Sequence, residues 1–120
     1  MKVVYIAGPF RAPTAWGIEN NVRRAEEWGL RVAEIGAMPL IPHSNTRFFH
    51  GALPDAFFLE GTLELLRRCD AMFLIPGWEQ SAGTRGEVAL ALELGKPKFQ
   101  EIGALRHWLE QFIELARVVR

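Results

Sequence analysis

The stretch DAMFLIPGWEQSAGTRGEVALALELGKP, residues 70–97, decides the fold of this chain. It opens with an unbroken apolar run at 71–75, and the lack of polar alternation predicts a strand buried on both faces. Proline and glycine at 76–77 end that strand. A helix is predicted over 84–94, because apolar residues recur there on one face and Gly95 follows as a stop signal. A strand, a glycine-containing loop and a helix in this order predict a binding site where the strand ends.

Small polar residues, Ser81, Gly83 and Thr84, precede the predicted helix. They bring backbone N–H groups and hydroxyls to its N-terminus, where unpaired donors and the helix dipole favour an anion such as a phosphate. Glu87 follows in the expected first turn, and two interpretations of it stay open. With Thr84 three residues before it, Glu87 fits a capping box, in which the carboxylate bonds to the main chain. Its place after a glycine loop at the carboxyl end of a central strand favours a carboxylate that faces a ligand.

Length and charge limit the class of protein. At 120 residues the chain is expected to form one domain, 1–120. Its 14 basic and 14 acidic residues balance, which argues against a nucleic acid polymer as partner. The single cysteine, Cys69, cannot form an internal disulfide, no apolar run approaches the ~20 residues that span a bilayer, and no Cys–His pairing has zinc spacing. We expect a cytoplasmic protein with a small-molecule ligand and no membrane partner, metal or cofactor.

The remaining elements alternate between strand and helix. Strands are predicted at 3–7, 38–41 and 98–102, and helices between Pro13 and Gly36, at 55–68 and at 103–118, with a long loop at 44–56 that folds over the site. This alternation predicts a three-layer α/β fold. We expect a flavodoxin-like, doubly wound parallel sheet of four to five strands in the order 2-1-3-4, with helices on both faces.

That strand order predicts where the pocket lies. It places the loop after the first strand beside the loop at 77–84, at the switch point of the sheet. The first of these loops has turn residues that let backbone approach a ligand: Gly8, Pro9, Phe10 and Arg11. His43 follows the second strand on the same side, and its pKa near neutrality suits a general acid, although a turn histidine without a role is the more common case.

Three stretches match one known family in order and spacing: YIAGPF at 5–10, CDAMFLIPGWEQSAGTRGE at 69–87 and ALELGKP at 91–97. Over 3–99 the chain resembles the nucleoside 2-deoxyribosyltransferase superfamily, particularly its small members that act on nucleoside 5'-monophosphates. The resemblance implies cleavage of the bond between deoxyribose C1' and a nucleobase, with the sugar passing to water or to another base. It places Glu87 at the family's nucleophilic glutamate, which would hold C1' as a glycosyl ester, as in retaining glycosidases.

The resemblance also implies binding roles. Ser81 and Gly83 stand where nucleotide-cleaving relatives carry a phosphate-contacting serine and a loop glycine, which favours a monophosphate, with an ordinary turn as the alternative for Ser81. The family lines its sugar and phosphate pocket with the loop after the first strand, whose Arg11 either binds phosphate or is solvated. An aromatic side chain near Tyr5 contacts the sugar in relatives, although Tyr5 also fits the core. Trp78 either stacks on the base or forms the pocket floor.

One position departs from the family pattern. The family usually carries an aspartate eight residues before the Asp that begins the third strand, and this chain has Thr62 there. A threonine cannot be a general acid, and Glu60 and Glu64 face elsewhere on a helix. Three outcomes stay open: another acid such as His43, a leaving group that needs little help, or binding without turnover.

Three classes of function therefore compete. The leading one is an N-glycosidic-bond enzyme, and the second is a noncatalytic nucleotide-binding module, which the threonine favours. The third is a structural or interaction domain, which rests on the apolar stripe of the last helix: Leu105, Trp108, Leu109, Phe112, Leu115, Ala116 and Val119. A homodimer or higher oligomer is also expected, because small relatives complete their pockets from a neighbouring subunit.

Overall fold

The computed structural model describes the backbone of residues 1–119 and the side chains of residues 1–113. The elements follow in the order β1 (Val3–Ala7), α1 (Ala15–Glu34), β2 (Met38–Leu40), α2 (Pro42–Asn45), the 3-10 turn η1 (Arg47–Phe49), α3 (Asp55–Arg67), β3 (Ala71–Leu74), the 3-10 turn η2 (Trp78–Gln80), α4 (Ala82–Glu93), β4 (Lys98–Phe99) and α5 (Ile102–Val119). Among the described residues, none of these helices has the length and apolarity needed to cross a bilayer.

The strands form one parallel sheet in the order β2-β1-β3-β4, as predicted. β1 and β3 are the central pair, and Tyr5 of β1 stands opposite Met72 of β3. Both central strands are buried on both faces, which agrees with their unbroken apolar runs. The carboxyl ends of β1 and β3 therefore lie side by side, and the loops that follow them share one edge of the sheet.

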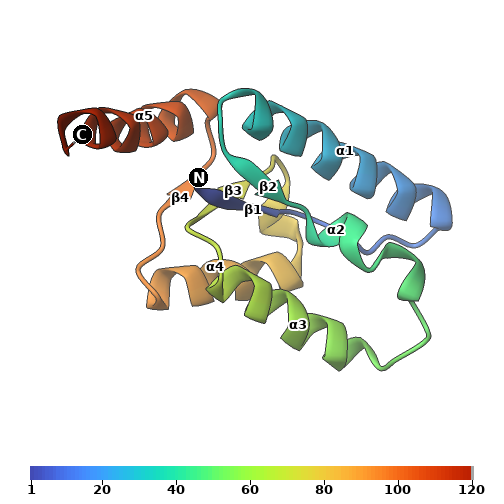
Figure 1. Cartoon of the computed structure of the whole chain (residues 1–120). Coiled ribbons are helices and arrows are strands. Elements are labelled where there is room, and N and C mark those ends of the chain that lie inside the picture. The colour runs from blue at the N-terminus through green and yellow to red at the C-terminus, as the bar shows by residue number, and fades with distance from the viewer. Residues whose placement is uncertain (120) are drawn as a thin grey trace.

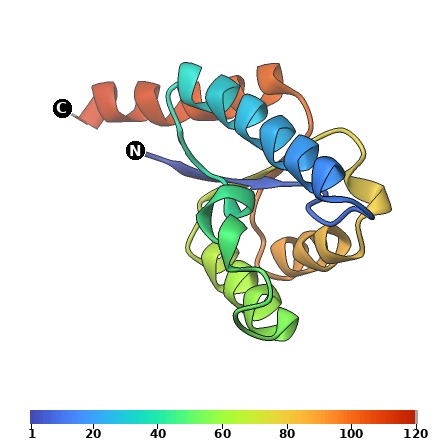
Figure 2. The ribbon, with the colours of Figure 1, turned by 90° about the vertical axis from the view of Figure 1, so that its right-hand side faces the viewer.

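Alternate residues of β1 belong to different layers (Figures 1 and 2). Val4 and Ile6 pack in a cluster with residues of α1 and α5. Tyr5 and Ala7 point to the opposite face and pack with residues of α3 and α4. The two views agree that α1 and α5 cover one face and α3 and α4 the other, so the predicted three layers are confirmed. Tyr5 thus faces α3 and α4.

Some element boundaries differ from the prediction. The prediction of a long irregular loop at 44–56 is wrong in part, because this stretch contains the end of α2 and all of η1. Helices this short do not span enough residues to show a 3.6-residue period in the sequence. β4 is only two residues long rather than the five expected, since α5 begins at Ile102.

The last helix is as long as expected, and its end projects beyond the sheet in both views (Figures 1 and 2). Leu105 and Leu109 of its predicted apolar stripe are buried against the sheet. The stripe's other members Leu115, Ala116 and Val119 lie outside the described side chains.

Candidate functional site

A carboxylate and a phenol meet at the centre of the fold. The hydroxyl of Tyr5, which is fully buried on β1, donates a hydrogen bond to Oε2 of Glu87 in the second turn of α4. The contact joins residues that are 82 positions apart in the chain. It forms because β1 and β3 are neighbours, and because α4 returns over the face of the sheet to which Tyr5 points.

This environment shifts the pKa of both groups. Burial raises the pKa of Glu87 to about 7, although the hydrogen bond from Tyr5 acts in the opposite direction. Burial and the neighbouring carboxylate raise the pKa of the Tyr5 phenol far above its usual value. Tyr5 therefore stays protonated and remains a donor, while Glu87 exists in both forms near neutral pH.

The capping-box interpretation of Glu87 is wrong. The helix begins at Ala82, two residues earlier than predicted, and its N-cap is Ser81, whose Oγ accepts the N–H of Thr84 at 3.2 Å. Thr84 is thus inside the helix and cannot be its cap. Glu87 lies beyond the first turn, and its carboxylate bonds to the side chain of Tyr5 on β1 instead of to the main chain of its own helix. This carboxylate is not needed to satisfy the start of α4.

At the start of α4, some backbone N–H groups have no acceptor within the helix. Ala82 and Gly83 are the first two helical residues, so their N–H groups have no acceptor within the helix. Thr84 is buried and its Oγ1 has no hydrogen-bond partner among the described residues. Trp78 packs partly buried against the core cluster that contains Tyr5, which fits a floor of the site, and its buried Nε1 likewise lacks a described partner.

The loop after β1 is held by side chains from other elements. Nε2 of His43 lies 3.0 Å from the carbonyl oxygen of Gly8 and 3.1 Å from that of Pro9, so this nitrogen carries the proton and donates. Asn21 of α1 donates to the carbonyl oxygen of Phe10 at 3.0 Å. Burial lowers the pKa of His43, which keeps the ring neutral. This geometry fits a residue that positions the loop better than a general acid.

Arg11 lies at the outer end of this loop. Its guanidinium pairs with the carboxylate of Asp55, the first residue of α3, at 3.1 Å, and both side chains are exposed. The ion pair links the loop after β1 to α3. Such an exposed pair contributes little stability, so the guanidinium can exchange partners at low cost.

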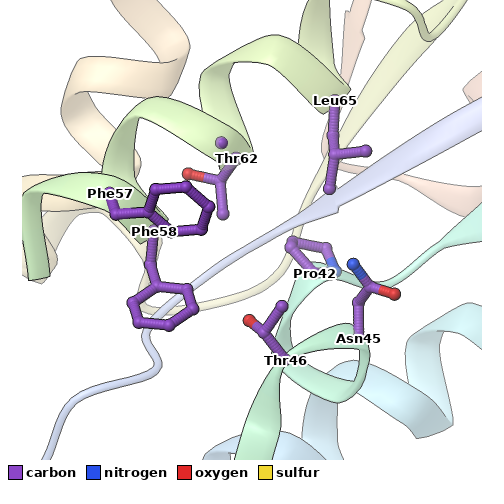
Figure 3. Close-up of a pocket in the computed structure, with 8 residues that line it drawn as sticks. Pro42, Asn45, Thr46, Phe57, Phe58, Thr62 and Leu65 are labelled. Carbon is purple, nitrogen blue, oxygen red and sulfur yellow. The ribbon is translucent and has the colours of Figure 1, made fainter. Parts of the chain in front are cut away.

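A cleft of about 230 Å³ opens between α2 and α3 (Figure 3). Its lining residues come from the two sides: Pro42, Asn45 and Thr46 from one, and Phe57, Phe58, Gly61, Thr62 and Leu65 from the other. Figure 3 shows Thr62 on the α3 side, facing the residues of the α2 side. Leu65 connects the cleft to the layer that holds Tyr5, because it lines the cleft and also packs against the core cluster that contains Tyr5. The hydroxyl of Thr62 donates to the carbonyl oxygen of Leu59 at 3.0 Å.

Several lining residues were not found from the sequence. Asn45, Thr46 and Phe57 lie in or next to the stretch that was predicted as a loop, where no periodic pattern assigns a face to any side chain. In the described part of the chain no group of three or more His, Cys, Asp or Glu side chains is arranged to hold a metal ion.

Comparisons with known proteins agree with this architecture. The model of the DUF4406 family, a domain of unknown function, matches residues 2–99. A search of curated proteins finds no match. Among solved structures, the chain is similar to a 2-deoxyribosyltransferase from the psychrotolerant bacterium Bacillus psychrosaccharolyticus, with a TM-score of 0.61 and 21% identity over 80% of this chain and 69% of that chain. The resemblance stated from the motifs is confirmed at the level of the fold.

Proposed function

The chain belongs to the DUF4406 family, and from this premise and the geometry of the site we propose that it cleaves the N-glycosidic bond of a (deoxy)nucleoside 5'-monophosphate, with Glu87 as the nucleophile. The observation that carries the proposal is the Tyr5–Glu87 pair. Glu87 is partly buried, and its carboxylate bonds to Tyr5 instead of to its own main chain, on the face of the sheet that α3 also covers. This arrangement suits chemistry better than capping. The enzyme that shares the fold is named for deoxyribosyl transfer, which supports the reaction class.

The proposed reaction has two steps. A carboxylate oxygen of Glu87 attacks C1' as the bond to the base breaks, through a transition state with oxocarbenium character, and a glycosyl ester forms. Water or a second base then takes the sugar and regenerates the carboxylate. Tyr5 binds one carboxylate oxygen and leaves the other for C1'. The reaction requires no cofactor.

A monophosphate fits the start of α4 better than an uncharged sugar does. The N–H groups of Ala82 and Gly83 have no acceptor within the helix, and they lie at the positive end of a helix dipole. Gly83 is not required by packing, since an added Cβ would meet its nearest neighbour, Leu59, at 3.9 Å. Arg11 offers a charge-assisted contact if it leaves Asp55 for a phosphate.

The test is covalent trapping. Protein incubated with nucleotide analogues that carry fluorine on the sugar is expected to gain the mass of the glycosyl group, because fluorine slows release of the ester more than its formation. Peptide mapping should place the adduct on Glu87. In turnover assays with each deoxynucleoside monophosphate, Glu87→Gln is expected to lower the rate of base release by more than about 10³-fold.

Glu93→Gln is the matched control, since Glu93 is an exposed carboxylate on the same helix. It is expected to keep wild-type turnover and adduct formation. Absence of both an adduct and free base with every nucleotide would count against an enzyme.

A second function, a noncatalytic nucleotide-binding module, is favoured by one observation: the residues that line the cleft carry no ionisable side chain. Calorimetry separates the two. Nucleotide affinity that is unchanged in Glu87→Ala, together with no turnover by the wild type, would support the module.

A further inference from the structure

The cleft between α2 and α3 is aromatic and uncharged. Its lining consists of the side chains of proline, asparagine, threonine, phenylalanine and leucine and of one glycine. Phe57 and Phe58 stand edge to face, with ring centroids 5.4 Å apart. A flat ring can pack against such a surface, and the amide of Asn45 and the hydroxyl of Thr46 are polar groups available to it. The hydroxyl of Thr62 already donates to the carbonyl oxygen of Leu59 and offers its oxygen only as an acceptor.

Side chains that could protonate a departing base face elsewhere in the described structure. Glu60 is exposed, and Glu64 is bound by two arginines, at 3.4 Å and 3.0 Å, on the outer surface of α3. His43 directs its proton to loop carbonyls. Tyr5 donates its hydrogen bond to Glu87, and Glu87 is the nucleophile that attacks C1' in the proposed reaction. General acid catalysis commonly contributes ~10² to 10⁴ in rate, so a base that needs a proton would leave slowly here.

We propose that the cleft receives a base that is already cationic: an N-glycoside whose bond to C1' comes from a quaternised nitrogen of a heteroaromatic ring. This inference rests on the proposed function and specifies its substrate class. The two chemical sources are pyridinium nucleotides and 7-alkylpurine nucleotides. In both, the ring that leaves is neutral.

The step balances without an acid. A lone pair of the Glu87 carboxylate forms the bond to C1', and the electron pair of the C1'–N bond passes to the ring nitrogen. The ring loses its positive charge and departs as neutral nicotinamide or neutral 7-alkylpurine. Water then attacks the ester, its proton passes to solvent, and the Glu87 carboxylate is restored.

The electrostatics of the cleft suit a cation. Faces of phenylalanine rings attract cations, and neither lysine nor arginine lines the cleft to repel one. The Glu87 carboxylate, which Tyr5 holds on the face of the sheet that α3 also covers, adds attraction. The nearest arginine of the β1 loop, Arg11, is neutralised by Asp55.

The first experiment compares rates of base release by chromatography. The cationic substrates are nicotinamide mononucleotide and 7-methylguanosine 5'-monophosphate. Guanosine 5'-monophosphate is the matched substrate with a neutral base. Both guanine compounds are tested in their ribose and deoxyribose forms. Release of a cationic base is expected to be at least 100-fold faster than release of guanine, and to be lost in Glu87→Gln. Neutral bases released as fast as cationic ones would overturn this inference and leave the proposed function standing. No release from any compound would overturn both.

The second experiment restores an acid. Thr62→Asp places a carboxyl group on the wall of the cleft, and Thr62→Asn is its near-isosteric control. The aspartate is expected to narrow the rate ratio between 7-methylguanosine and guanosine monophosphates at least tenfold, whereas the asparagine leaves that ratio as in the wild type. A ratio that stays unchanged in Thr62→Asp, in a variant shown by circular dichroism to be folded, would contradict the inference.

Discussion

The carboxyl group of Glu87 is subject to two opposing influences. Burial against the core raises its pKa, and the hydrogen bond from Tyr5 lowers it, which leaves a value of about 7. Near neutral pH a modest change in either influence alters the ionised fraction considerably. Tyr5 is thus a positioning residue that controls both the direction and the charge of the proposed nucleophile.

Removing the phenol hydroxyl tests this control directly. Tyr5→Phe deletes the donor that favours the carboxylate, so the pKa of Glu87 is expected to rise by about one unit or more. Carbon-13 NMR of the labelled glutamate carboxyl groups measures this without a substrate. Glu64 of α3 is solvent exposed and unchanged in the variant, and its titration serves as the internal control. An unshifted Glu87 would mean that the phenol does not hold the carboxylate.

The same pKa shift makes stability depend on pH. The folded pKa of Glu87 is raised from 4.5 to about 7, so the native state binds its proton more tightly than the unfolded chain. The resulting stability is present below pH 4.5 and is lost as pH rises through 7, which amounts to about 3 kcal/mol. Glu87→Gln is expected to lack this loss, so urea unfolding at pH 5 and pH 8 should show a smaller decrease than in the wild type.

The comparison isolates Glu87 because His43 is present in both proteins. Its lowered pKa acts in the opposite direction, since its stability contribution is lost as pH falls. Glu93→Gln should behave as the wild type. Equal pH dependence in all three proteins would show that the Glu87 carboxyl is not buried as described.

At the residue scale, the sequence identifies Glu87 but not its partner. Residue spacing alone allowed two interpretations of the Glu87 carboxylate, a helix cap and a group that faces a ligand. The observed start of the helix at Ala82 excludes the capping box. The contact with Tyr5 depends on strand register and on the return path of α4, which local patterns do not encode. The pairing of Arg11 with Asp55 was not predictable for the same reason.

The loop after β1 shows how two elements fix a third. Gly8 lies against Ile75, which follows β3 and is buried, and a Cβ added at Gly8 would come within 2.2 Å of Ile75 Cγ1. The motif glycine is therefore explained by packing between neighbouring strand ends, whatever ligand the loop binds. His43 then holds the loop from the α2 side.

Gly8→Ala is accordingly expected to be destabilising. Ile75 is itself buried, so overpacking against it should lower the free energy of unfolding by about 1–3 kcal/mol. Urea unfolding measures the change. The matched control is Gly103→Ala in α5, where an added Cβ has no neighbour within 4 Å. If both variants are equally stable, the close approach of Gly8 to Ile75 is not a constraint.

At the scale of elements, long periodic segments were predicted well and short ones poorly. The helix over 55–68 was placed to within one residue, because apolar residues repeat over several turns. α2 and η1 left no such pattern, although α2 provides His43 and part of the cleft. The element that sequence reasoning treated as a loop thus forms one wall of the site.

For the whole molecule, the alternation of strands and helices predicted the parallel sheet, and the flavodoxin-like pattern predicted its strand order. The order in turn placed the loops after β1 and β3 together, which is why the location of the site was predictable before its contacts were. The cleft was not predictable, since it lies between α2 and α3, whose relative position follows from side-chain packing.

The surface near the cleft leads to the last prediction, a homodimer. Phe48, Phe49, Leu53 and Phe57 are exposed by 85%, 53%, 48% and 55%, and they follow one another closely on η1, the next loop and the start of α3. Exposed large apolar side chains in such numbers are typical of an interface.

Light scattering at micromolar concentration is expected to give twice the 13.6 kDa of one chain. Phe48→Asp should shift the protein to monomer, whereas Leu92→Asp, at an exposed leucine of α4, should not. Because Phe57 also lines the cleft, a dimer would enclose the substrate from this side, and monomeric wild-type protein would refute it.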